Sequence, residues 1–578
     1  MYYSLAAFTL CFQLSFKCLY GVKSFSPAQK TLLPPNVPTE SATSDAFNKL
    51  FEDNFLEIDK QKMEFSAPLP PWLKGTLVRN GAGVFGSTQR RYTHLFDGLS
   101  KLSSFTISPS PETSHFSAKF LRSDWYRHIV TEKKDLPWAI GAGVMKPPLP
   151  MWKRFFGIFD KSFDNTGVNV HQLGGVKGPW VAITDAPVMN AIEPLSLTTI
   201  GKTEYANKLS PSGGTEFFSS AHPKSSLNGD DISYNIFAEI NPLGTNTLHV
   251  AAINEKLERS IIGSIKLEKG ELPYVHDFSI TSKYAILCLY PLNWDLNQVL
   301  NENGMFDAMK WNASAPTKIY VFDLARAADK SEEDKTQYVA YFEAPASFGY
   351  HHVNAYEESV DGKPEIVLDM VAHNHPDIIK GKHAFGFLDN LIQPEARKEL
   401  TLEGNVLRYR LPLGSSKTDG PVKTAPSITN IIQNPAVNCD LRMEYPTINP
   451  TYYGRRHRYA YGVASRAGEG QYLGSYLDWA IVKQDMLRAV ENCDKGSSLS
   501  TALWWKEANC FPSEAVFVPS PKVSTEDDGV LLSQVYDANR EESFLLVLDA
   551  ANMKEISRAY LGCVCSYSFH GLFIPSEK

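Results

Sequence analysis

Four histidines that stand beside strand-like segments are the residues most able to do chemistry in this chain. They are His222, His276, His351 and His570. Neutral imidazole is the commonest side-chain ligand for metals in proteins. The gaps between these histidines, of 54, 75 and 219 residues, exceed the short ligand spacings of zinc modules. If all four meet at one ion, a closed fold must bring them together.

Short β-compatible runs with turn residues between them recur along the whole chain. They begin at Thr76, Trp180, Thr247, Tyr284, Lys318, Glu365, Val406, Tyr459, Val530 and Phe544. Many short strands at modest spacing favour an all-β sandwich, barrel or propeller. Two of the runs, KIYVFDL and FLLVLDA, end on an aspartate and a turn, as propeller blades often do. Helical sequence is weak and is concentrated in Asp45 to Lys60.

Composition predicts one large globular unit. Hydrophobic residues make up 43% of the 578 residues and charged residues 21%, which are ordinary globular values. From about residue 47 onward the chain has no linker or low-complexity block, so residues 47–578 are predicted to form a single domain. The net charge of −7, without a basic stripe of interleaved aromatics, argues against a nucleic-acid partner.

The first residues have the composition of targeting segments. Residues 1–24 are largely apolar but too short to cross a bilayer, and small residues at their end predict cleavage before Phe25. Residues 25–46 are rich in Ser, Thr and Pro with few acidic residues, which is transit-peptide composition. Together they resemble the bipartite plastid presequences of algae with secondary plastids. The alternative is an ordinary secretory leader, with the protein in the secretory pathway or at endomembranes.

Eight segments, in this order along the chain, resemble the carotenoid cleavage oxygenases. They are LVRNGAGVFG, THLFDG, PYVHDFSIT, HHVNAYEE, MEYPTINPTYYGRRHRYAYG, FPSEAVFVP, EDDGVLLS and the closing FHGLFIP. The resemblance implies a seven-bladed β-propeller with a dome of helices and loops. It also implies a non-haem Fe(II) on the propeller axis. The spellings THLFDGLSKL and KFLRSDWY are closest to the branch of the animal β-carotene oxygenases and the retinoid isomerase.

The resemblance makes the four histidines the ligands of the iron. Four imidazoles without a carboxylate suit ferrous iron and leave two of its six positions for O₂ and substrate. Asp277, next to His276, is the nearest candidate for a site with two histidines and one carboxylate, but adjacent side chains on a strand face opposite ways. The same alternation requires a choice between His351 and His352. The resemblance favours His351, with His352 packing or bonding behind it.

Metal-bound histidines need their second ring nitrogen held, usually by a carboxylate or a carbonyl. By their place in the family motifs, Glu444 in MEYP and Glu514 in PSEA are implied to be two such acids. Asp185, in AITDAP, stands where many relatives have a third glutamate. Its shorter side chain leaves open whether the contact is direct, water-mediated or absent.

The activity implied by the resemblance is oxidative cleavage of a conjugated C=C bond in a carotenoid or apocarotenoid, retinal-forming enzymes being among the relatives. O₂ is the second substrate and two carbonyl compounds are the products. No side chain needs to act as nucleophile or general base. Three alternatives stay open: cleavage of stilbene-type or lignin-derived alkenes, retinoid isomerisation on the same iron, and a non-catalytic carotenoid-binding protein.

The segment from Leu136 to Phe159 is a candidate for contact with a membrane surface. Aromatic residues there stand beside Lys146, Lys153 and Arg154, and prolines prevent a spanning helix. Aromatic and basic residues flanking an apolar run are typical of an interfacial patch. The segment is therefore predicted to dock peripherally on a bilayer and to take the lipophilic substrate from it. The alternative is an ordinary buried dome segment.

Overall fold

A computed structural model describes most of the chain. The described residues are 46–576 except 111–112, 136–140, 151–163, 211–212, 242–243, 296–297, 299–303, 326–337, 382–383, 394–395, 397–399, 401–403, 415–421, 424–426, 431–441, 466–478, 490–501 and 523. The leader predicted for residues 1–24 and nearly all of the transit-like segment 25–46 lie outside the described residues. So does most of the predicted membrane patch, of which 141–150 are described.

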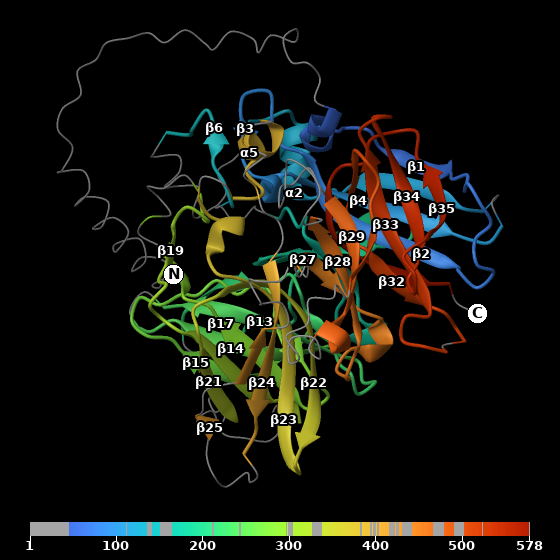
Figure 1. The fold of residues 1–578 in the computed structure, drawn as a ribbon. Helices are drawn as coiled ribbons and strands as arrows, with labels where there is room; N and C mark the ends of the chain where they lie inside the picture. The colour runs from blue at the N-terminus through green and yellow to red at the C-terminus, as the bar shows by residue number, and fades with distance from the viewer. Residues whose placement is uncertain are drawn as a thin grey trace.

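The described part of the chain is dominated by β-sheets that follow one another in sequence order (Figure 1). In the first sheet the order is β1 (Ile58–Lys62), β5 (His115–Phe120), β4 (Leu99–Ile107), β2 (Gly75–Val84) and β36 (Ser568–Pro575). In the second it is β10 (Thr198–Thr203), β9 (Ala186–Glu193), β8 (Trp180–Thr184) and β7 (Asn169–Gln172). In the third it is β11 (Thr215–Ser219), β13 (Ile232–Ile240), β14 (Thr247–Asn254) and β15 (Arg259–Lys266), and β12 (Lys224–Ser225) also pairs with β13.

The next sheets continue this arrangement. One contains β16 (Ser279–Ile280), β17 (Tyr284–Leu289), β20 (Thr317–Asp323), β21 (Ala340–Ala344) and β25 (Val422–Lys423). An eight-stranded sheet contains β22 (Phe348–Val360), β23 (Lys363–His373), β24 (Gly404–Pro412), β26 (Ser427–Asn430), β27 (Arg442–Thr447), β28 (Tyr459–Ser465), β29 (Trp479–Asp485) and β30 (Ala502–Trp505). The last contains β31 (Cys510–Pro512), β32 (Val516–Pro519), β33 (Gly529–Asp537), β34 (Glu542–Asp549) and β35 (Glu555–Tyr560).

The two ends of the described chain meet in one sheet. β36 pairs with β2 in antiparallel register, with Gly75 opposite Pro575 and Arg79 opposite Gly571. Apolar side chains of this sheet, such as Phe105, pack against those of the last sheet, such as Leu532. In Figure 1 the blue strands β1, β2 and β4 accordingly lie beside the red strands β33, β34 and β35. The C-terminal strand thus completes the N-terminal sheet and fixes the last segment of the chain.

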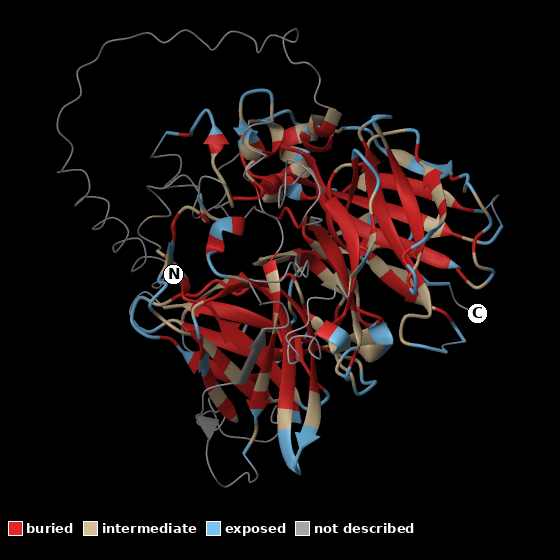
Figure 2. Ribbon diagram, viewed as in Figure 1, coloured by how far each residue is buried: buried red, intermediate tan, exposed pale blue. Residues whose placement is uncertain are grey.

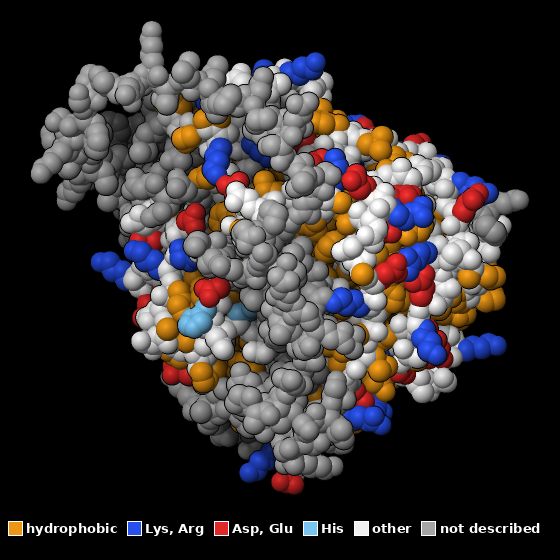
Figure 3. Space-filling view, turned by 45° about the horizontal axis from the view of Figure 1, so that its top comes forward, with side chains coloured by type: hydrophobic (Ala, Val, Ile, Leu, Met, Phe, Trp, Pro, Cys, Tyr) orange, Lys and Arg blue, Asp and Glu red, His pale blue; other side chains and the backbone are white. Residues whose placement is uncertain are grey.

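Most of the buried residues lie in the strands of the sheets, which are largely red in Figure 2. All residues of β2 and of β29 are buried, so both faces of these strands are covered by neighbouring structure. The buried residues of these strands include charged ones, Arg79 in β2 and Lys483 in β29, and each of these has polar partners. On the face drawn in Figure 3, basic and acidic side chains are interspersed over the described surface.

Short helices and two small hairpins make up the remaining elements. β3 (Arg91–Tyr92) pairs with β6 (Met145–Lys146), and β18 (Leu292–Trp294) pairs with β19 (Met309–Trp311). The helices are η1 (Ala46–Phe51), η2 (Leu95–Asp97), α2 (Asp124–Tyr126), η3 (Arg127–Thr131), η4 (Gly175–Lys177), η7 (Pro376–Ile378), α5 (Leu388–Ile392) and η8 (Pro450–Tyr452). In Figure 1, β3, β6, α2 and α5 gather at one end of the molecule. None of the helices in the described ranges is long and apolar enough to cross a membrane.

The helix predicted for Asp45 to Lys60 was too long. The helix in this region, η1, ends at Phe51, and β1 starts at Ile58 and pairs with β5. Tertiary pairing overrides the weak local helix propensity of this segment, because a strand on an open sheet edge gains ladder hydrogen bonds that an isolated helix of this length does not provide.

Candidate metal centre

The fold brings the four predicted histidines to one point. His222 follows β11, His276 precedes β16, His351 lies in β22 and His570 lies in β36. Each offers one ring nitrogen, and these nitrogens all lie within 4.8 Å of one another. The Nε2 atoms of His222 and His276 are 2.9 Å apart, and those of His351 and His570 are 3.2 Å apart. His276, His351 and His570 are buried, and His222 is partly buried.

β-Bulges direct the strand-borne residues of this centre. The register of β22 against β23 shifts between Gly349 and His352, which leaves one extra residue on β22 beside His351. The pairing of β36 with β2 shifts in the same way at His570. A bulge bends the strand and changes the direction of a side chain. The two bulges therefore let the imidazoles of His351 and His570 point to the common centre, although most of β22 and β36 is regularly paired.

The strand β27, which carries Glu444, has a third such shift. It lies between Glu444 and Thr447 in the pairing with β28. Tyr445 there has a φ of 51°, in the left-handed region that a bulky residue rarely adopts. Backbone strain of this kind persists only where the surrounding structure enforces it, and such positions cluster at functional sites.

Three of the four histidines bond a carboxylate through Nδ1. His276 contacts Asp185 at 2.6 Å, His351 contacts Glu444 at 2.6 Å, and His570 contacts Glu514 at 2.9 Å. The contact of Asp185 is therefore direct, the first of the three possibilities that the sequence left open. Nδ1 of His222 makes no hydrogen bond to a residue in the described part of the chain.

The electrostatics keep Glu444 and Glu514 ionised. Burial would raise the pKa of Glu444, but His351 and His373 outweigh it and lower the pKa to about 2. At Glu514 burial would also raise the pKa, but His570 and Arg79 outweigh it, and the pKa is lowered. Burial lowers the pKa of His222 and of His570, which favours neutral imidazoles. An ionised carboxylate only accepts hydrogen bonds, so Nδ1 of each bonded histidine carries the proton.

With the proton on Nδ1, Nε2 of His351 and Nε2 of His570 each present a lone pair. Two acceptors 3.2 Å apart repel each other unless a cation lies between or beside them. Two imidazole nitrogens bound at right angles to one ion, at about 2.1 Å each, lie roughly 3 Å apart. The donor set, its neutral charge and its spacing therefore fit one divalent transition-metal ion.

Each carboxylate is held from behind by residues that sequence reasoning did not assign. Asp185 accepts from the hydroxyl of Tyr274 at 2.8 Å and from the Ala221 amide at 2.9 Å. Glu444 lies 2.9 Å from Nε2 of His373. Glu514 lies 3.3 Å from the guanidinium of Arg79, which is completely buried.

These supporting residues differ in how visible they are from sequence. His373 lies at the end of β23, and its place behind Glu444 makes it part of the centre's support. Arg79 directly follows the apolar pair LV in the β-compatible run LVRNG, and a charge at such a position is a signal of a buried partner. Tyr274 stands two residues before His276 on the same side of an extended segment, which places both side chains together.

Asp277 and His352 face away from the centre, as the alternation of strand side chains predicted. The Asp277 carboxylate forms an ion pair with Lys224 at 2.6 Å. The ring of His352 contacts the hydroxyl of Ser279 at 2.8 Å and that of Tyr290 at 3.2 Å.

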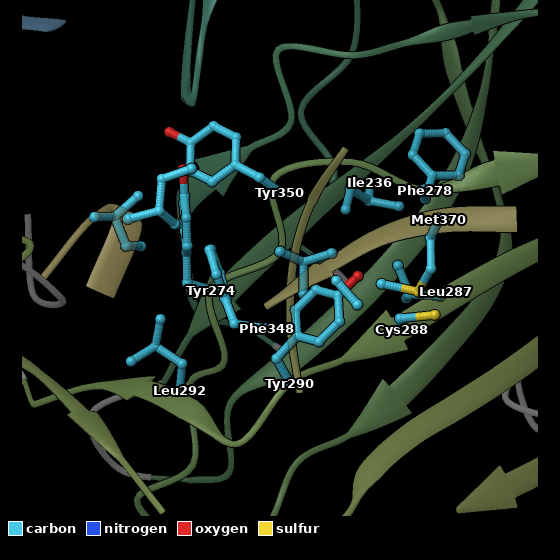
Figure 4. Close-up of a cluster of buried hydrophobic side chains, with 14 of the residues drawn as sticks. Ile236, Tyr274, Phe278, Leu287, Cys288, Tyr290, Leu292, Phe348, Tyr350 and Met370 are labelled. Carbon is cyan, nitrogen blue, oxygen red and sulfur yellow. The ribbon is translucent and has the colours of Figure 1, made fainter. Parts of the chain in front are cut away.

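Aromatic side chains surround the histidines. The ring centre of Tyr350 lies 4.3 Å from that of His276, and the ring centre of Tyr445 lies 5.3 Å from that of His570. Phe96 packs on Phe569, the neighbour of His570, at 5.0 Å. Figure 4 shows Tyr350 beside Tyr274 and near Phe348, at one end of a large buried apolar cluster. Such surroundings keep water away and suit an apolar, conjugated ligand.

Comparison with known proteins gives one family and consistent neighbours. The model of the family described as "Retinal pigment epithelial membrane protein" matches residues 51–575. The mitochondrial carotenoid-cleaving dioxygenase of Macaca fascicularis is 27% identical over 551 residues, covering 88% of this chain and 90% of that protein. The human beta,beta-carotene 15,15'-dioxygenase is 25% identical over 559 residues, covering 90% of this chain and 93% of that protein.

Solved structures share the fold. A variant of the Synechocystis apocarotenoid oxygenase superposes with a TM-score of 0.71 at 22% identity, covering 92% of this chain and 98% of that chain. A cobalt-substituted form of the same Synechocystis enzyme superposes with a TM-score of 0.70 at 23% identity, with the same coverage.

Proposed function

The chain belongs to the carotenoid oxygenase family, whose model is described as retinal pigment epithelial membrane protein, and from this premise we propose its reaction. In this proposal the protein is a non-haem Fe(II) dioxygenase that cleaves a conjugated C=C bond of a carotenoid or apocarotenoid with O₂ and releases aldehyde or ketone products. The observation that carries the proposal is the set of converging Nε2 lone pairs, because only a bound cation makes that arrangement favourable.

The ferrous ion, when bound, supplies the redox activation of O₂ that carbon-carbon bond cleavage requires. His222, His276, His351 and His570 bind it as neutral donors. Asp185, Glu444 and Glu514 hold the proton on Nδ1 of three of these rings and fix the ring directions. None of these residues acts as a nucleophile or transfers a proton to the substrate.

The aromatic surroundings support a polyene as the substrate. Phe96, Tyr350 and Phe569 present apolar ring surface beside the histidines, and a conjugated chain gains by burial against such surface. The relatives act on substrates of this class by their names, which are a carotenoid-cleaving dioxygenase and a β-carotene dioxygenase. A carotenoid or apocarotenoid is the substrate class that both observations support.

We also infer a seven-bladed propeller. If the eight-stranded sheet is divided at the two-residue pairing of β24 with β27, the described strands outside the two small hairpins form seven sheets of four or five strands each. The pairing of β36 with β2 supplies the closure that such a ring needs. Peripheral docking through Leu136 to Phe159, and import into a plastid by the leader, stay predictions.

The experiment is a comparison of the purified protein with His276→Ala. Both are freed of metal, loaded with Fe²⁺ without oxygen, and incubated in detergent micelles with β-carotene, apocarotenals, a retinyl ester and resveratrol in air. O₂ uptake and the masses of the carbonyl products are measured. We expect one equivalent of iron in the parent protein, with aldehydes from a polyene. His276→Ala should show neither.

Three outcomes would replace the proposal. Cleavage of resveratrol alone would assign a stilbene-type alkene as substrate. A polyene that binds without O₂ uptake, to a protein that takes up no iron, would indicate a carotenoid-binding protein. Conversion of a retinyl ester without O₂ uptake would indicate an isomerase.

A further inference from the structure

A second polar network lies immediately behind the metal centre, on the side that faces away from it. Lys224 stands two residues after His222, Asp277 follows His276, and His352 follows His351. Each member is thus carried by one of three ligand-bearing segments, which come from different sheets. The three members do not touch the imidazoles of the centre, and their contacts with one another cross between the segments.

Asp277 is the residue that joins the other two. One of its oxygens lies 2.6 Å from Nζ of Lys224, and the other accepts a hydrogen bond from the His352 amide at 2.9 Å. Nζ of Lys224 also lies 5.8 Å from the centre of the Phe278 ring. A single carboxylate therefore connects the segment of His222 to the segment of His351 through the segment of His276.

The bulge in β22 explains why the His352 amide is available to Asp277. The register shift between Gly349 and His352 that turns His351 toward the centre also disturbs the regular pairing of the next amide. A buried amide without a partner is costly, and Asp277 supplies that partner. The ring of His352 is fixed in addition by Ser279 and by Tyr290, whose place in the apolar cluster is visible in Figure 4.

The charges make this network sensitive to the loss of one member. The side chain of Asp277 is 3% exposed, and that of Lys224 is 27% exposed. A carboxylate at such burial is tolerated only when it is paired and hydrogen-bonded. If Lys224 loses its charge, the buried carboxylate of Asp277 lacks its ionic partner, and a change in its position weakens the contact that holds the His352 amide.

We propose that Asp277, paired with Lys224, is a positioning residue of the metal centre: it sets the mutual distances of His222, His276 and His351 without contacting their rings. The inference rests on the proposed function in that the four histidines must hold a metal ion. It extends that function by assigning the spacing of the ligands to a contact outside the ligand set and outside the three carboxylates that bond Nδ1.

The test is a titration of metal-free protein with Co²⁺, followed by the visible absorption of the bound ion. The position and intensity of Co²⁺ bands depend on the number and arrangement of its ligands, so the spectrum reports geometry. The variants are Asp277→Asn, Lys224→Met, Lys224→Arg and the double variant of Asp277→Asn with Lys224→Met. We expect the two single removals of charge to weaken Co²⁺ binding by about 10–100-fold, the range for outer residues of metal sites, and to shift the spectrum.

Two further comparisons separate positioning from general destabilisation. Lys224→Arg keeps the charge and should restore most of the affinity and the parent spectrum, and the double variant should be less impaired than the sum of its parts. Asp369→Asn is the matched control, since Asp369 is also a buried carboxylate, pairs with Arg408 at 2.7 Å, and forms no hydrogen bond or ion pair with any of the four histidines in the described part of the chain. It should lower stability and leave the Co²⁺ spectrum unchanged.

The outcomes distinguish this inference from the function on which it rests. If the parent protein and His276→Ala both fail to bind Co²⁺, the metal centre itself is refuted. If the parent binds one Co²⁺ and Asp277→Asn binds it with the same affinity and spectrum, the positioning role alone is refuted. An equal spectral change in Asp369→Asn would also refute it, because loss of stability would then account for the effect.

Discussion

Arg79 and Glu514 form a buried ion pair across 435 residues of sequence, at 3.3 Å. The guanidinium also donates to the hydroxyl of Ser568 at 2.8 Å and to the carbonyl of Phe569 at 3.1 Å. Glu514 in turn bonds Nδ1 of His570. One side chain of β2 therefore holds the C-terminal strand in the first sheet and also fixes the acid behind one of the histidines, so closure of the fold and assembly of the centre depend on the same contact.

Arg79→Met is expected to destabilise the protein strongly. Removal of one partner of a buried ion pair leaves the other charge uncompensated and typically costs about 3–5 kcal/mol. The measurement is the free energy of unfolding in urea. The control is Arg122→Met, which breaks the exposed pair with Glu57 and should cost less than about 1 kcal/mol. Equal losses in the two variants would contradict the role assigned to Arg79.

Adjacent histidines should respond in opposite ways. His351→Gln removes a ring nitrogen of the centre, so the protein should no longer hold one equivalent of iron. His352→Gln removes contacts with Ser279 and Tyr290 only, which should cost about 1–3 kcal/mol of stability while iron content persists. Iron per polypeptide after dialysis decides the matter. Retention of iron in His351→Gln, or its loss in a folded His352→Gln, would reverse the assignment.

Asp185→Asn should weaken metal binding more than Tyr274→Phe. Asp185 accepts from His276, Tyr274 and the Ala221 amide together, and an asparagine directs its NH₂ group at one or more of these donors. Loss of the carboxylate behind a ligand lowers metal affinity by about 10–100-fold. Tyr274→Phe removes one donor and leaves the acid in contact with His276. Titration with Co²⁺ measures both, and a larger loss in Tyr274→Phe would assign the main support to the hydroxyl.

The strands and the candidate site were largely predictable, for different reasons. Strands cover the runs that begin at Thr76, Trp180 and Val530, because apolar sequence between turn residues specifies strands locally. The four histidines and the acids behind them were found through family motifs, since no local rule joins residues 219 positions apart. The seven blades and the identity of the metal as iron are part of the proposed function.

What sequence could not supply are contacts that only the assembled fold creates. The pairs Arg79 with Glu514 and His373 with Glu444 join positions without a spacing rule. The bulge at His351 is equally invisible, because an extra residue in a ladder is defined only against the partner strand. The helix expected up to Lys60 failed for a related reason: the partner of that segment, β5, lies far along the chain.

Asp97 should give the stability of the protein a distinct pH dependence. Burial raises the pKa of Asp97 to about 7, against the opposing hydrogen bonds from the Gly143 and Ala142 amides. A carboxyl whose pKa is higher in the folded state binds its proton more tightly when folded. Its contribution to the free energy of unfolding is thus complete below about pH 4 and is lost as the pH rises to about 7.

The variant that checks this is Asp97→Asn, studied by urea unfolding between pH 4.5 and 8. The stability advantage of the parent protein over the variant should shrink as the pH rises, by about 1.4 kcal/mol for each pKa unit of the shift. An advantage that grows with pH would mean that the two backbone amides stabilise the ionised carboxylate more than burial disfavours it.

Removal of the metal should lower thermal stability in a way that depends on the four histidines. An ion that binds only the folded state raises the free energy of unfolding by RT ln(1 + [L]/Kd). This increase is about 2.7 kcal/mol when the free ion concentration is 100 times Kd. Chelation should therefore lower Tm, and Fe²⁺ added without oxygen should restore it. His276→Ala should have a Tm that neither treatment changes. His249→Gln is the matched control, since His249 is a buried histidine that bonds Glu239 and is not one of the four histidines of the centre: its Tm should be lower than that of the parent but should still rise with Fe²⁺. If neither the chelator nor Fe²⁺ changes the Tm of the parent protein, the converging imidazoles hold no ion.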